Sequence, residues 1–295
     1  MNANRICFFN FLAAILLSLP LAISAQEEDP FALEGVDAET EEQPEVPDEV
    51  TVGLYYLDDD SYRFGKYTGL TDEGAEPLVD FRIDRRPQWD SGDTVRWSLE
   101  GWRLGLDSRR LLLDMNQQGT QSFVADYREI PNNRFSDGQT PYRGAGQSVL
   151  TLPASWAVED GSNNTRGFLT LDENLANLKI DTLRRRMDLG YERKLPRGWS
   201  LSVDYRHETK RGERPIGSIF GFTGGNPRAV LVPAPVDYTT DNVDAMFSWS
   251  HGRAQFGFGV FASWFSNDET SLVWQNAYGR QPQWDESVQY PGSQG

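Results

Sequence analysis

The sequence predicts an all-β protein, an antiparallel transmembrane β-barrel of the outer membrane. Three observations support this fold class: apolar and polar residues alternate with a period of two, several of these runs are long, and tight and long connections alternate along the chain. Strands of soluble proteins average about 5–6 residues, whereas a tilted strand needs about 9–11 residues to cross a bilayer. A soluble sandwich with one wet face is the alternative that alternation alone leaves open.

Composition excludes several classes of protein. The chain has 295 residues, 12% of them aromatic, which argues against a largely disordered chain. Its formal net charge of −16 argues against nucleic acid as a partner, because phosphate binding needs clustered Lys and Arg. Cys7 is the only cysteine, so these residues provide no disulfide framework, no Cys-rich metal site and no covalent haem attachment.

The first 25 residues have the layout of a cleaved signal peptide. Arg5 precedes an apolar run from Phe8 to Ala22, and the small residue Ala25 comes just before charge returns. A single transmembrane anchor is the alternative, but the run is short for a span of about 20 residues and contains Pro20. We therefore expect residues 1–25 to direct export to the cell outer membrane.

Residues 26–50 predict an acidic, disordered periplasmic segment. Between Gln26 and Asp60 there are 14 acidic residues and no Lys or Arg, and Pro44 and Pro47 interrupt the run. Such a composition repels itself and stays solvated. A solvated spacer is the favoured interpretation, with contact to a basic partner as the alternative. Residues 51–295 are expected to supply strands and loops of the barrel.

The alternation defines seven strands most clearly. It is strongest over residues 199–208, where Ser, Asp, Arg and Glu separate the apolar positions. In the other six runs the separating residues are mostly polar or glycine. The apolar positions, in chain order, are Val79, Phe81 and Ile83; Val95, Trp97 and Leu99; Phe123, Ala125 and Tyr127; Met187, Leu189 and Tyr191; Trp199, Leu201, Val203 and Tyr205; Val243, Ala245, Phe247 and Trp249; and Ala254, Phe256, Phe258, Val260, Ala262 and Trp264.

Connection lengths agree with a barrel, whose periplasmic turns are short and whose outer loops are longer. Pro196–Gly198 and His251–Arg253 are tight, whereas Thr209–Thr240 and the link from about Ile130 to Asp181 are long. The second long link contains Leu171, Leu175 and Leu178 at the spacing of a short helix.

The number of strands predicts a part of a larger barrel. Nine or ten strands fit between Thr51 and Gln275, and Gln289–Gly295 does not resemble a closing strand. A barrel in lipid must pair its last strand with its first. We therefore expect the chain to be the N-terminal portion of a larger barrel, incomplete at its C-terminal end.

The polar positions of the strands are expected to face a hydrated lumen. They carry both signs of charge, which neighbouring strands can pair. The lumen-facing candidates are Arg82, Arg96, Arg184, Arg186, Asp188, Asp204, Arg206 and Asp244.

The sequence predicts no catalytic, cofactor-binding or metal-binding residues. His207 and His251 lie on the apolar side of their strands, which favours an interfacial position over an axial haem ligand. The run Asp58–Asp60 could hold Ca²⁺, but a solvated acidic turn is favoured. Arg184–Arg186 could clamp an anion or a haem propionate, or simply form a charged strand end.

The segment Asp58–Leu70 resembles a signature of the MtrB/PioB family of decahaem-associated outer-membrane barrels. The residues that carry this structural signature are Asp60, Ser61, Arg63, Phe64, Gly65, Tyr67, Gly69 and Leu70. Further matches follow in family order at Ile130–Pro131, Thr140–Gly146, Leu150–Trp156, Arg206–Glu208, Pro233–Tyr238 and Ser263–Asn267. Some relatives carry a C-x-x-C near the mature N-terminus that this chain lacks, so no role of that pair is transferred.

The resemblance implies a sheath that holds a periplasmic multihaem c-type cytochrome, insulates it from lipid and so supports electron transfer across the outer membrane. It also implies an outer-surface cytochrome as a second partner. The partner carries the haem, this chain binds no cofactor itself, and it is not an enzyme. The alternative is a general outer-membrane porin or solute channel without a haem partner. A barrel enzyme ranks below both, since no catalytic residues stand out.

Overall fold

The computed structural model describes residues 47–88, 91–159, 164–220 and 228–278. The predicted signal peptide and nearly all of the predicted acidic segment lie outside the described residues. The first strand, β1 (Glu49–Leu57), begins two residues before the predicted start of the barrel region at Thr51.

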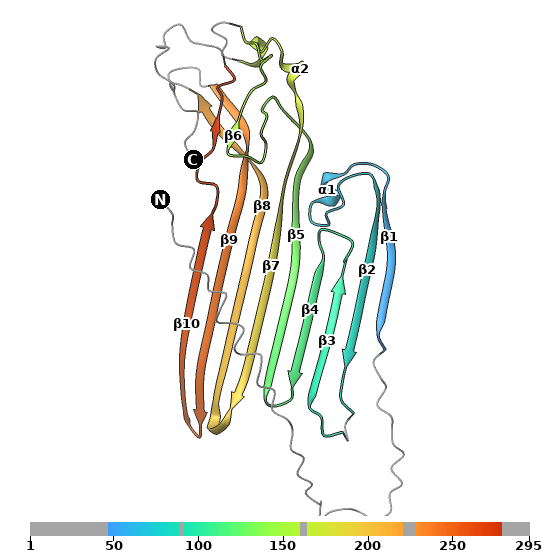
Figure 1. Cartoon of the computed structure of the whole chain (residues 1–295), viewed down its shortest axis with the longest axis vertical. Helices are drawn as coiled ribbons and strands as arrows, with labels where there is room; N and C mark the ends of the chain where they lie inside the picture. The colour runs from blue at the N-terminus through green and yellow to red at the C-terminus, as the bar shows by residue number, and fades with distance from the viewer. Residues whose placement is uncertain (1–46, 89–90, 160–163, 221–227, 279–295) are drawn as a thin grey trace, which may run out of the picture. The chain divides into compact units, whose positions relative to one another are not determined.

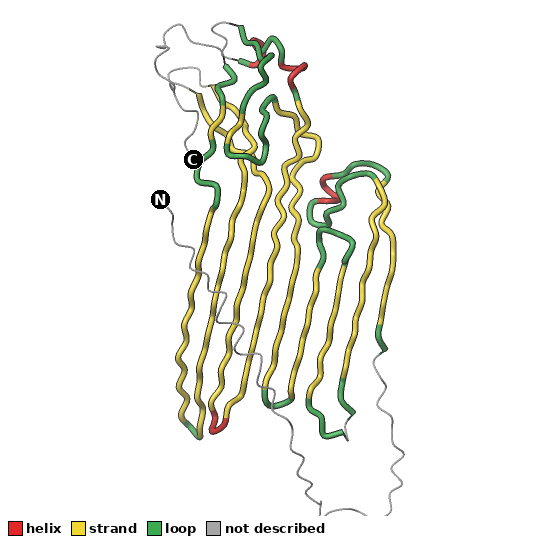
Figure 2. Tube along the Cα trace, viewed as in Figure 1, coloured by secondary structure: helices red, strands yellow, loops and turns green. Residues whose placement is uncertain are grey.

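The described part is dominated by one nine-stranded sheet with the order β1-β2-β3-β4-β5-β7-β8-β9-β10 (Figures 1 and 2). Every neighbouring pair in this sheet is antiparallel, which confirms the predicted antiparallel all-β fold. The remaining strands are β2 (Gly74–Arg85), β3 (Val95–Trp102), β4 (Arg110–Gln117), β5 (Gln121–Thr140), β7 (Ala176–Leu195), β8 (Trp199–Phe220), β9 (Arg228–His251) and β10 (Ala254–Asn267). Within the described residues β1 and β10 each pair with one strand, so this sheet is not closed into a ring.

The helices of the described part are single turns. They are α1 (Tyr62–Gly65), α2 (Leu171–Asn174) and the 3-10 turns η1 (Thr165–Gly167) and η2 (Pro196–Gly198). Among the residues that the structure describes, no helix is long and apolar enough to cross a membrane.

Eight of the nine strands of this sheet fall into two groups by length, and β10, with 14 residues, lies between them. Strands β1 to β4 contain 8 to 12 residues, and we call them the low wall. Strands β5, β7, β8 and β9 contain 20 to 24 residues, and we call them the tall wall. Figure 1 shows the tall wall continuing well beyond the end of the low wall on the side of the long loops. The tall strands are therefore about twice as long as a bilayer requires.

Two predicted loop boundaries are wrong because these strands are so long. The predicted link from Ile130 to Asp181 is reduced to residues 141–175, and the predicted link Thr209–Thr240 to residues 221–227. Prolines suggested a loop, yet Pro215 pairs with Pro233 and Glu213 with Pro235. Antiparallel pairs alternate between hydrogen-bonded and non-hydrogen-bonded types, so these positions share one type. A proline at a non-hydrogen-bonded position has no ladder hydrogen bond to lose, so the pairing of the two strands stays intact.

The predicted helix with Leu171, Leu175 and Leu178 is also mostly wrong. Only Leu171 belongs to α2, and Leu178 lies in β7 paired with Gly138. Three leucines at helical spacing are too short a pattern to make a stable helix, because a short helix is marginal by itself. Here the residues from Ala176 onward pair with β5 as a strand instead.

The tight turns lie at the opposite end from the long loops (Figure 2). The turn between β7 and β8 requires glycine, because Gly198 has a φ of 81° and an added Cβ would lie 2.1 Å from the Ser250 carbonyl oxygen. Its neighbour Arg197 also has a positive φ, of 63°. Two such residues match the twist of an antiparallel hairpin.

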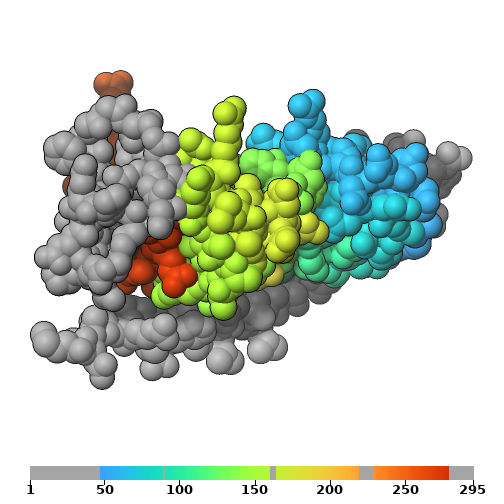
Figure 3. Space-filling view, turned by 90° about the horizontal axis from the view of Figure 1, so that it is seen from above, coloured from blue at the N-terminus to red at the C-terminus, as the bar shows by residue number. Residues whose placement is uncertain are grey.

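A small hydrophobic cluster covers the long-loop end of the β8–β9 hairpin. Its buried members are Tyr142, Leu150, Val232, Ala234, Leu272, Trp274 and Ala277. The long loop contributes β6 (Val149–Leu150), which pairs in parallel with β11 (Val273–Trp274). In Figure 3, which looks onto this end, the yellow-green long loop and the red β11 segment lie together. Burial raises the pKa of Tyr142, whose hydroxyl donates to the Gln275 carbonyl oxygen.

Candidate functional site

Strand register divides the nine-stranded sheet into two chemically different faces. Apolar residues oppose apolar residues across the strands, as in Val203 against Ala245 and Phe247 against Phe258. Their neighbours in sequence point the other way and are mostly polar. We call the first side the apolar face and the second side the polar face. Large apolar side chains on the apolar face are exposed, for example Phe258 at 61%, as in a lipid-facing surface.

All eight predicted lumen-facing residues lie on the polar face. Register places Arg82 opposite Glu100, Arg96 opposite Asn116, and Arg184 opposite Lys210. It also joins Asp188 to Arg206 and Asp204 to Asp244. Arg186 lies opposite Glu208, between Arg184 and Asp188 along β7. That this face lines a closed lumen stays a prediction.

An ion-pair cluster centred on Asp126 joins β4 to β5 on the polar face. Arg110 donates two hydrogen bonds to the carboxylate, at 2.9 Å from Nε and 2.8 Å from Nη2. Arg128 donates to the same carboxylate. Asp126 is buried by these contacts at 5% exposure, while both guanidinium groups remain partly exposed. Two-point arginine–carboxylate contacts are geometrically specific and charge-assisted.

A second ion-pair cluster, centred on Asp188, joins β7 to β8. Arg186 donates from Nε to Asp188 Oδ2 at 2.5 Å, and Arg206 donates from Nε to Oδ1 at 2.6 Å. Farther toward the long loops, Arg184 of β7 pairs with Glu208 of β8 at 3.4 Å. Because Asp126 and Asp188 are direct register partners, the two clusters form one charged band across four strands. Most of its charges are neutralised within the wall.

On the polar face of β4–β9, the side chains of Asp114, Glu192, Asp204 and Asp244 form no hydrogen bond or ion pair with another described residue. Asp204 lies directly opposite Asp244, an arrangement that repels. The other register partner of Asp204 is Gly190, which has no side chain.

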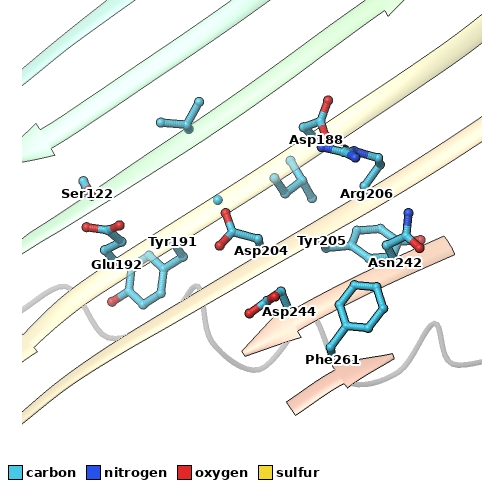
Figure 4. Close-up of a pocket in the computed structure, with 13 residues that line it drawn as sticks. Ser122, Asp188, Tyr191, Glu192, Asp204, Tyr205, Arg206, Asn242, Asp244 and Phe261 are labelled. Atoms are coloured by element: carbon cyan, nitrogen blue, oxygen red, sulfur yellow. Dashed lines mark hydrogen bonds and ion pairs between the residues drawn. The ribbon is translucent and has the colours of Figure 1, made fainter. Parts of the chain in front are cut away.

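A recess of about 600 Å³ opens on the polar face at this point. Figure 4 shows Asp204 between the Asp188–Arg206 pair and Glu192. Asp244 and Phe261 line the same recess. Among the described residues that line the recess there are four carboxylates and one cation, Arg206.

The apolar face changes character part-way along the tall wall. From Trp199 to Tyr205 its residues on β8 are apolar or aromatic, and then His207 and Asp241 form a hydrogen bond of 2.8 Å. Tyr205 donates its hydroxyl to the same Asp241 carboxylate at 2.7 Å. Arg211 pairs with Asp237 at 3.1 Å farther on. The predicted bilayer-spanning part of β8 thus ends near His207, after a length that suits one crossing.

The signature segment Asp58–Leu70 forms the connection between β1 and β2, and it lies on the free edge of β5 above the end of β4. Asn133 of β5 donates its backbone N–H to the Lys66 carbonyl oxygen and its side-chain amide to that of Gly65. Gly65 packs so closely that an added Cβ would lie 2.4 Å from the Leu70 carbonyl oxygen. Ser61 caps α1 by accepting from the Phe64 N–H.

The remaining signature residues complete or border the same turn. Asp60 accepts from the Glu73 N–H at 2.7 Å, Gly69 adopts a φ of 86°, and Leu70 is buried. Arg63, Phe64 and Tyr67 are exposed. The segment therefore covers backbone groups that β4 leaves unpaired, which is a structural role.

The other candidates from the sequence take structural positions. His207 lies on the apolar face beside Asp241, and His251 stacks on Trp249 at 6.0 Å at the tight-turn end. Arg185 lies on the apolar side and pairs with Glu129 at 3.3 Å, so the three arginines 184–186 do not act as one clamp. Within the described ranges no three His, Cys, Asp or Glu side chains converge as metal ligands do.

Sequence reasoning missed the centres of the polar face. Arg110, Asp126 and Arg128 were not among the predicted residues, although Asp126 and Arg128 alternate with the apolar Ala125 and Tyr127. The period of two could have placed them on this face. Their contact with Arg110 depends on the register between β4 and β5, which one sequence does not provide.

Comparison with known proteins identifies the fold family. The family model for the outer membrane beta-barrel porin MtrB/PioB matches residues 56–293. The chain belongs to the MtrB/PioB family. It is also 29% identical over 233 residues to "Outer membrane protein MtrB" of Shewanella baltica (strain OS185). That match covers 78% of this chain and 31% of the relative, so the chain spans about a third of the length of the relative.

Family membership confirms three of the predictions. The resemblance to MtrB/PioB is correct, the fold is that of an antiparallel outer-membrane β-barrel, and the protein is located in the outer membrane. MtrB/PioB proteins are described as porins, which are not a class of enzyme. The apolar face described above is then the side that contacts lipid.

Proposed function

We propose that this chain forms part of a barrel wall that holds a multihaem c-type cytochrome and so supports electron transfer across the outer membrane. The polar face carries the proposal, because it is continuous across nine strands and its central charges are paired within the wall. In this role the wall binds and insulates the cytochrome. The partner carries the haem groups, and no catalytic group is required from this chain.

The charge pattern suits a protein as the occupant. Asp126 and Asp188 are each held by two arginines, so both signs of charge lie side by side in the middle of the polar face, with a modest excess of arginine. A wall of this kind can contact a folded protein through adaptable hydrogen bonds without strong repulsion of either sign. An ion-selective pore instead lines its constriction with one sign of charge. Membership of the MtrB/PioB family supports the same choice.

The long-loop end is where we place a second partner, an outer-surface cytochrome. Long loops of outer-membrane barrels lie on the extracellular side. Here the described residues of the loop between β5 and β7 pack around Tyr142 and Leu150, which gives that end an ordered surface. An ordered surface loses less conformational entropy on binding than a flexible loop does.

Copurification tests the proposed function. The full-length protein is tagged and extracted with mild detergent from cells that express their own multihaem cytochromes. We expect a Soret absorption band that stays with the barrel through size-exclusion chromatography. Barrel that elutes folded but without a Soret band, from cells in which the cytochromes are present, would contradict the proposal.

The second candidate is a porin or solute channel without a haem partner. The description of the family as porins favours it, and Asp114, Asp204 and Asp244 could attract cations along the wall. Conductance in a planar bilayer separates the two functions. A sheath conducts only after its cytochrome is removed, whereas a porin conducts as extracted.

A further inference from the structure

Charges on the polar face are sorted along the strands from β4 to β9. On the side of the long loops the charged residues are mostly basic, whereas on the side of the tight turns they are mostly acidic. We call these the basic tier (Arg110, Arg128, Arg184, Arg186, Lys210 and Arg214, with Glu208) and the acidic tier (Asp114, Glu192, Asp204 and Asp244, with Lys194). Asp126, Asp188 and Arg206 form the row between them.

Within single strands, whose order does not depend on tilt, the sorting is clearest along β7, where Glu192 and Asp188 lie nearer the tight turn than Arg186 and Arg184. Along β8 the signs alternate from Asp204 to Glu208, and only the part toward the long loops, with Lys210 and Arg214, is uniformly basic. On β4, Arg110 lies toward the long loops and Asp114 toward the tight turn. β2 and β3 have no such order, because Arg96 there lies nearer the tight turn than Glu100. The sorted surface is therefore confined to β4–β9.

The two tiers differ from the central row in being incompletely paired. In the acidic tier Asp204 and Asp244 repel across the ladder and have no cation within the described chain. In the basic tier Lys210 forms no ion pair within the described residues, and its register partner is Arg184. Directly opposed like charges are destabilising unless an external charge compensates them. Both tiers thus carry excess charge of opposite sign.

We propose that this sorted surface docks the inserted protein in one direction. The occupant has a basic surface against the acidic tier and an acidic surface against the basic tier. This inference rests on the proposed function and adds an orientation to it. The recess beside Asp204 and Asp244 receives a basic side chain of the occupant, and Phe261 at its border provides an apolar contact for the stem.

Charge complementarity sets the direction because the reversed occupant places like charges together at both tiers. Such juxtaposition costs several kcal/mol across an interface, whereas matched surfaces speed docking and fix register. The ionic part of the attraction is screened by salt over about 8–10 Å. Retention of the occupant should therefore depend on salt and on the unpaired residues of both tiers.

The test uses the full-length barrel with its copurified cytochrome, washed on a column with increasing salt. Asp204→Asn with Asp244→Asn should lower the cytochrome retained at about 0.15 M salt by about threefold or more. Arg184→Gln with Lys210→Gln should also lower it. The matched control, Asp237→Asn with Asp241→Asn, removes two charges from the opposite face of β9 and should leave retention within about 1.5-fold of the unmodified barrel.

The two proposals fail in different ways. An unmodified barrel that carries no Soret band contradicts the proposed function. An unmodified barrel that carries the band, with polar-face and control variants that lose it equally, contradicts only the sorted surface. Heat modifiability on gels reports folding, and Asp204→Asn alone serves if the double variant does not fold.

Discussion

The low wall and the tall wall follow the same rule of alternation but end differently. In the low wall, strands of 8 to 12 residues stop at about the height of one bilayer crossing. The signature segment covers the edge of β5 that extends beyond the end of β4. In the tall wall, strands of 20 to 24 residues continue past that height into a hydrophobic cluster. Alternation thus determines which way side chains point, whereas packing at the outer end determines where strands stop.

The difference also extends to electrostatics. In the low wall, Arg82 and Glu100 form an ion pair of 3.5 Å with the arginine half exposed. At the start of the tall wall, Asp126 is buried between two arginines. The walls therefore share a lipid-facing side but differ in how firmly the polar side is organised, and the tall wall is the better candidate for docking.

The largest expected effect tests what the two walls share. Val203→Arg in the tall wall and Leu99→Arg in the low wall each place a charge on the apolar face near the middle of the part predicted to span the bilayer. We expect each to lower the free energy of unfolding by about 2–4 kcal/mol in phospholipid vesicles. Ser202→Arg, on the polar face, is the control and should cost little. Equal losses in Val203→Arg and Ser202→Arg, measured by urea unfolding, would refute the assignment of faces.

The next effect should appear only in the tall wall. Leu150 is fully buried in the outer cluster, so Leu150→Ala should destabilise that cluster by about 2–4 kcal/mol. Limited proteolysis should then cleave within residues 141–175 while the strands stay protected. Val149→Ala changes an exposed neighbour and should leave the pattern unchanged. Proteolysis that spreads into the low wall would show that the two regions unfold together.

A smaller difference is expected between the ion pairs of the two walls. Asp126→Asn leaves Arg110 and Arg128 without a charged partner and should cost about 1–3 kcal/mol. Glu100→Gln breaks the more exposed pair of the low wall and should cost less than about 1 kcal/mol. Urea unfolding measures both, and a ranking in the opposite order would remove the distinction between the walls.

The contact between the signature segment and β5 should be weakened by Asn133→Ala. This substitution removes the side-chain hydrogen bond to the Gly65 carbonyl oxygen and should weaken the signature segment by about 1–2 kcal/mol. Hydrogen exchange over residues 61–71 should become faster. Arg63→Ala alters an exposed signature residue and should not change exchange. Faster exchange in Arg63→Ala than in Asn133→Ala would contradict the claim that the hydrogen bond from Asn133 holds the segment.

The smallest effect concerns the outer edge of the low wall. A hydrogen bond from Arg85 lowers the pKa of Asp48, next to the start of β1. A lowered carboxyl pKa means that this contact is present above the ordinary pKa of Asp and is lost as the pH falls through the lowered value. Protection of the first amides of β1, corrected for the intrinsic pH dependence of exchange, should therefore fall at low pH. In Asp48→Asn the protection factors should be low and the same at neutral and low pH.

Much of the sheet could be predicted because the face of a strand residue depends only on its neighbours in sequence. Arg184, Arg186 and Asp188 alternate with Arg185 and Met187, and register places them as the alternation predicts. The tight turns at Pro196–Gly198 and His251–Arg253 were equally local signals.

The rest depends on contacts between residues distant in sequence. Asn133 and Gly65 are 68 positions apart, and Arg110 meets Asp126 only in one register. The ends of β8 and β9 were misplaced because proline normally breaks a strand, whereas here Pro215 and Pro233 oppose each other. Which prolines a strand tolerates depends on the pairing type of each position, and this is fixed by the partner strand.

Cysteine scanning of residues 199–208 in the native outer membrane tests the two-faced wall most directly. Cys7 is the only natural cysteine, so each introduced thiol can be followed separately. A water-soluble maleimide should label the even positions once the occupant is removed, and the odd positions up to Tyr205 should react only with a lipid-soluble reagent. Uniform labelling by the water-soluble reagent along all ten positions would contradict a wall with one side in lipid and one in water.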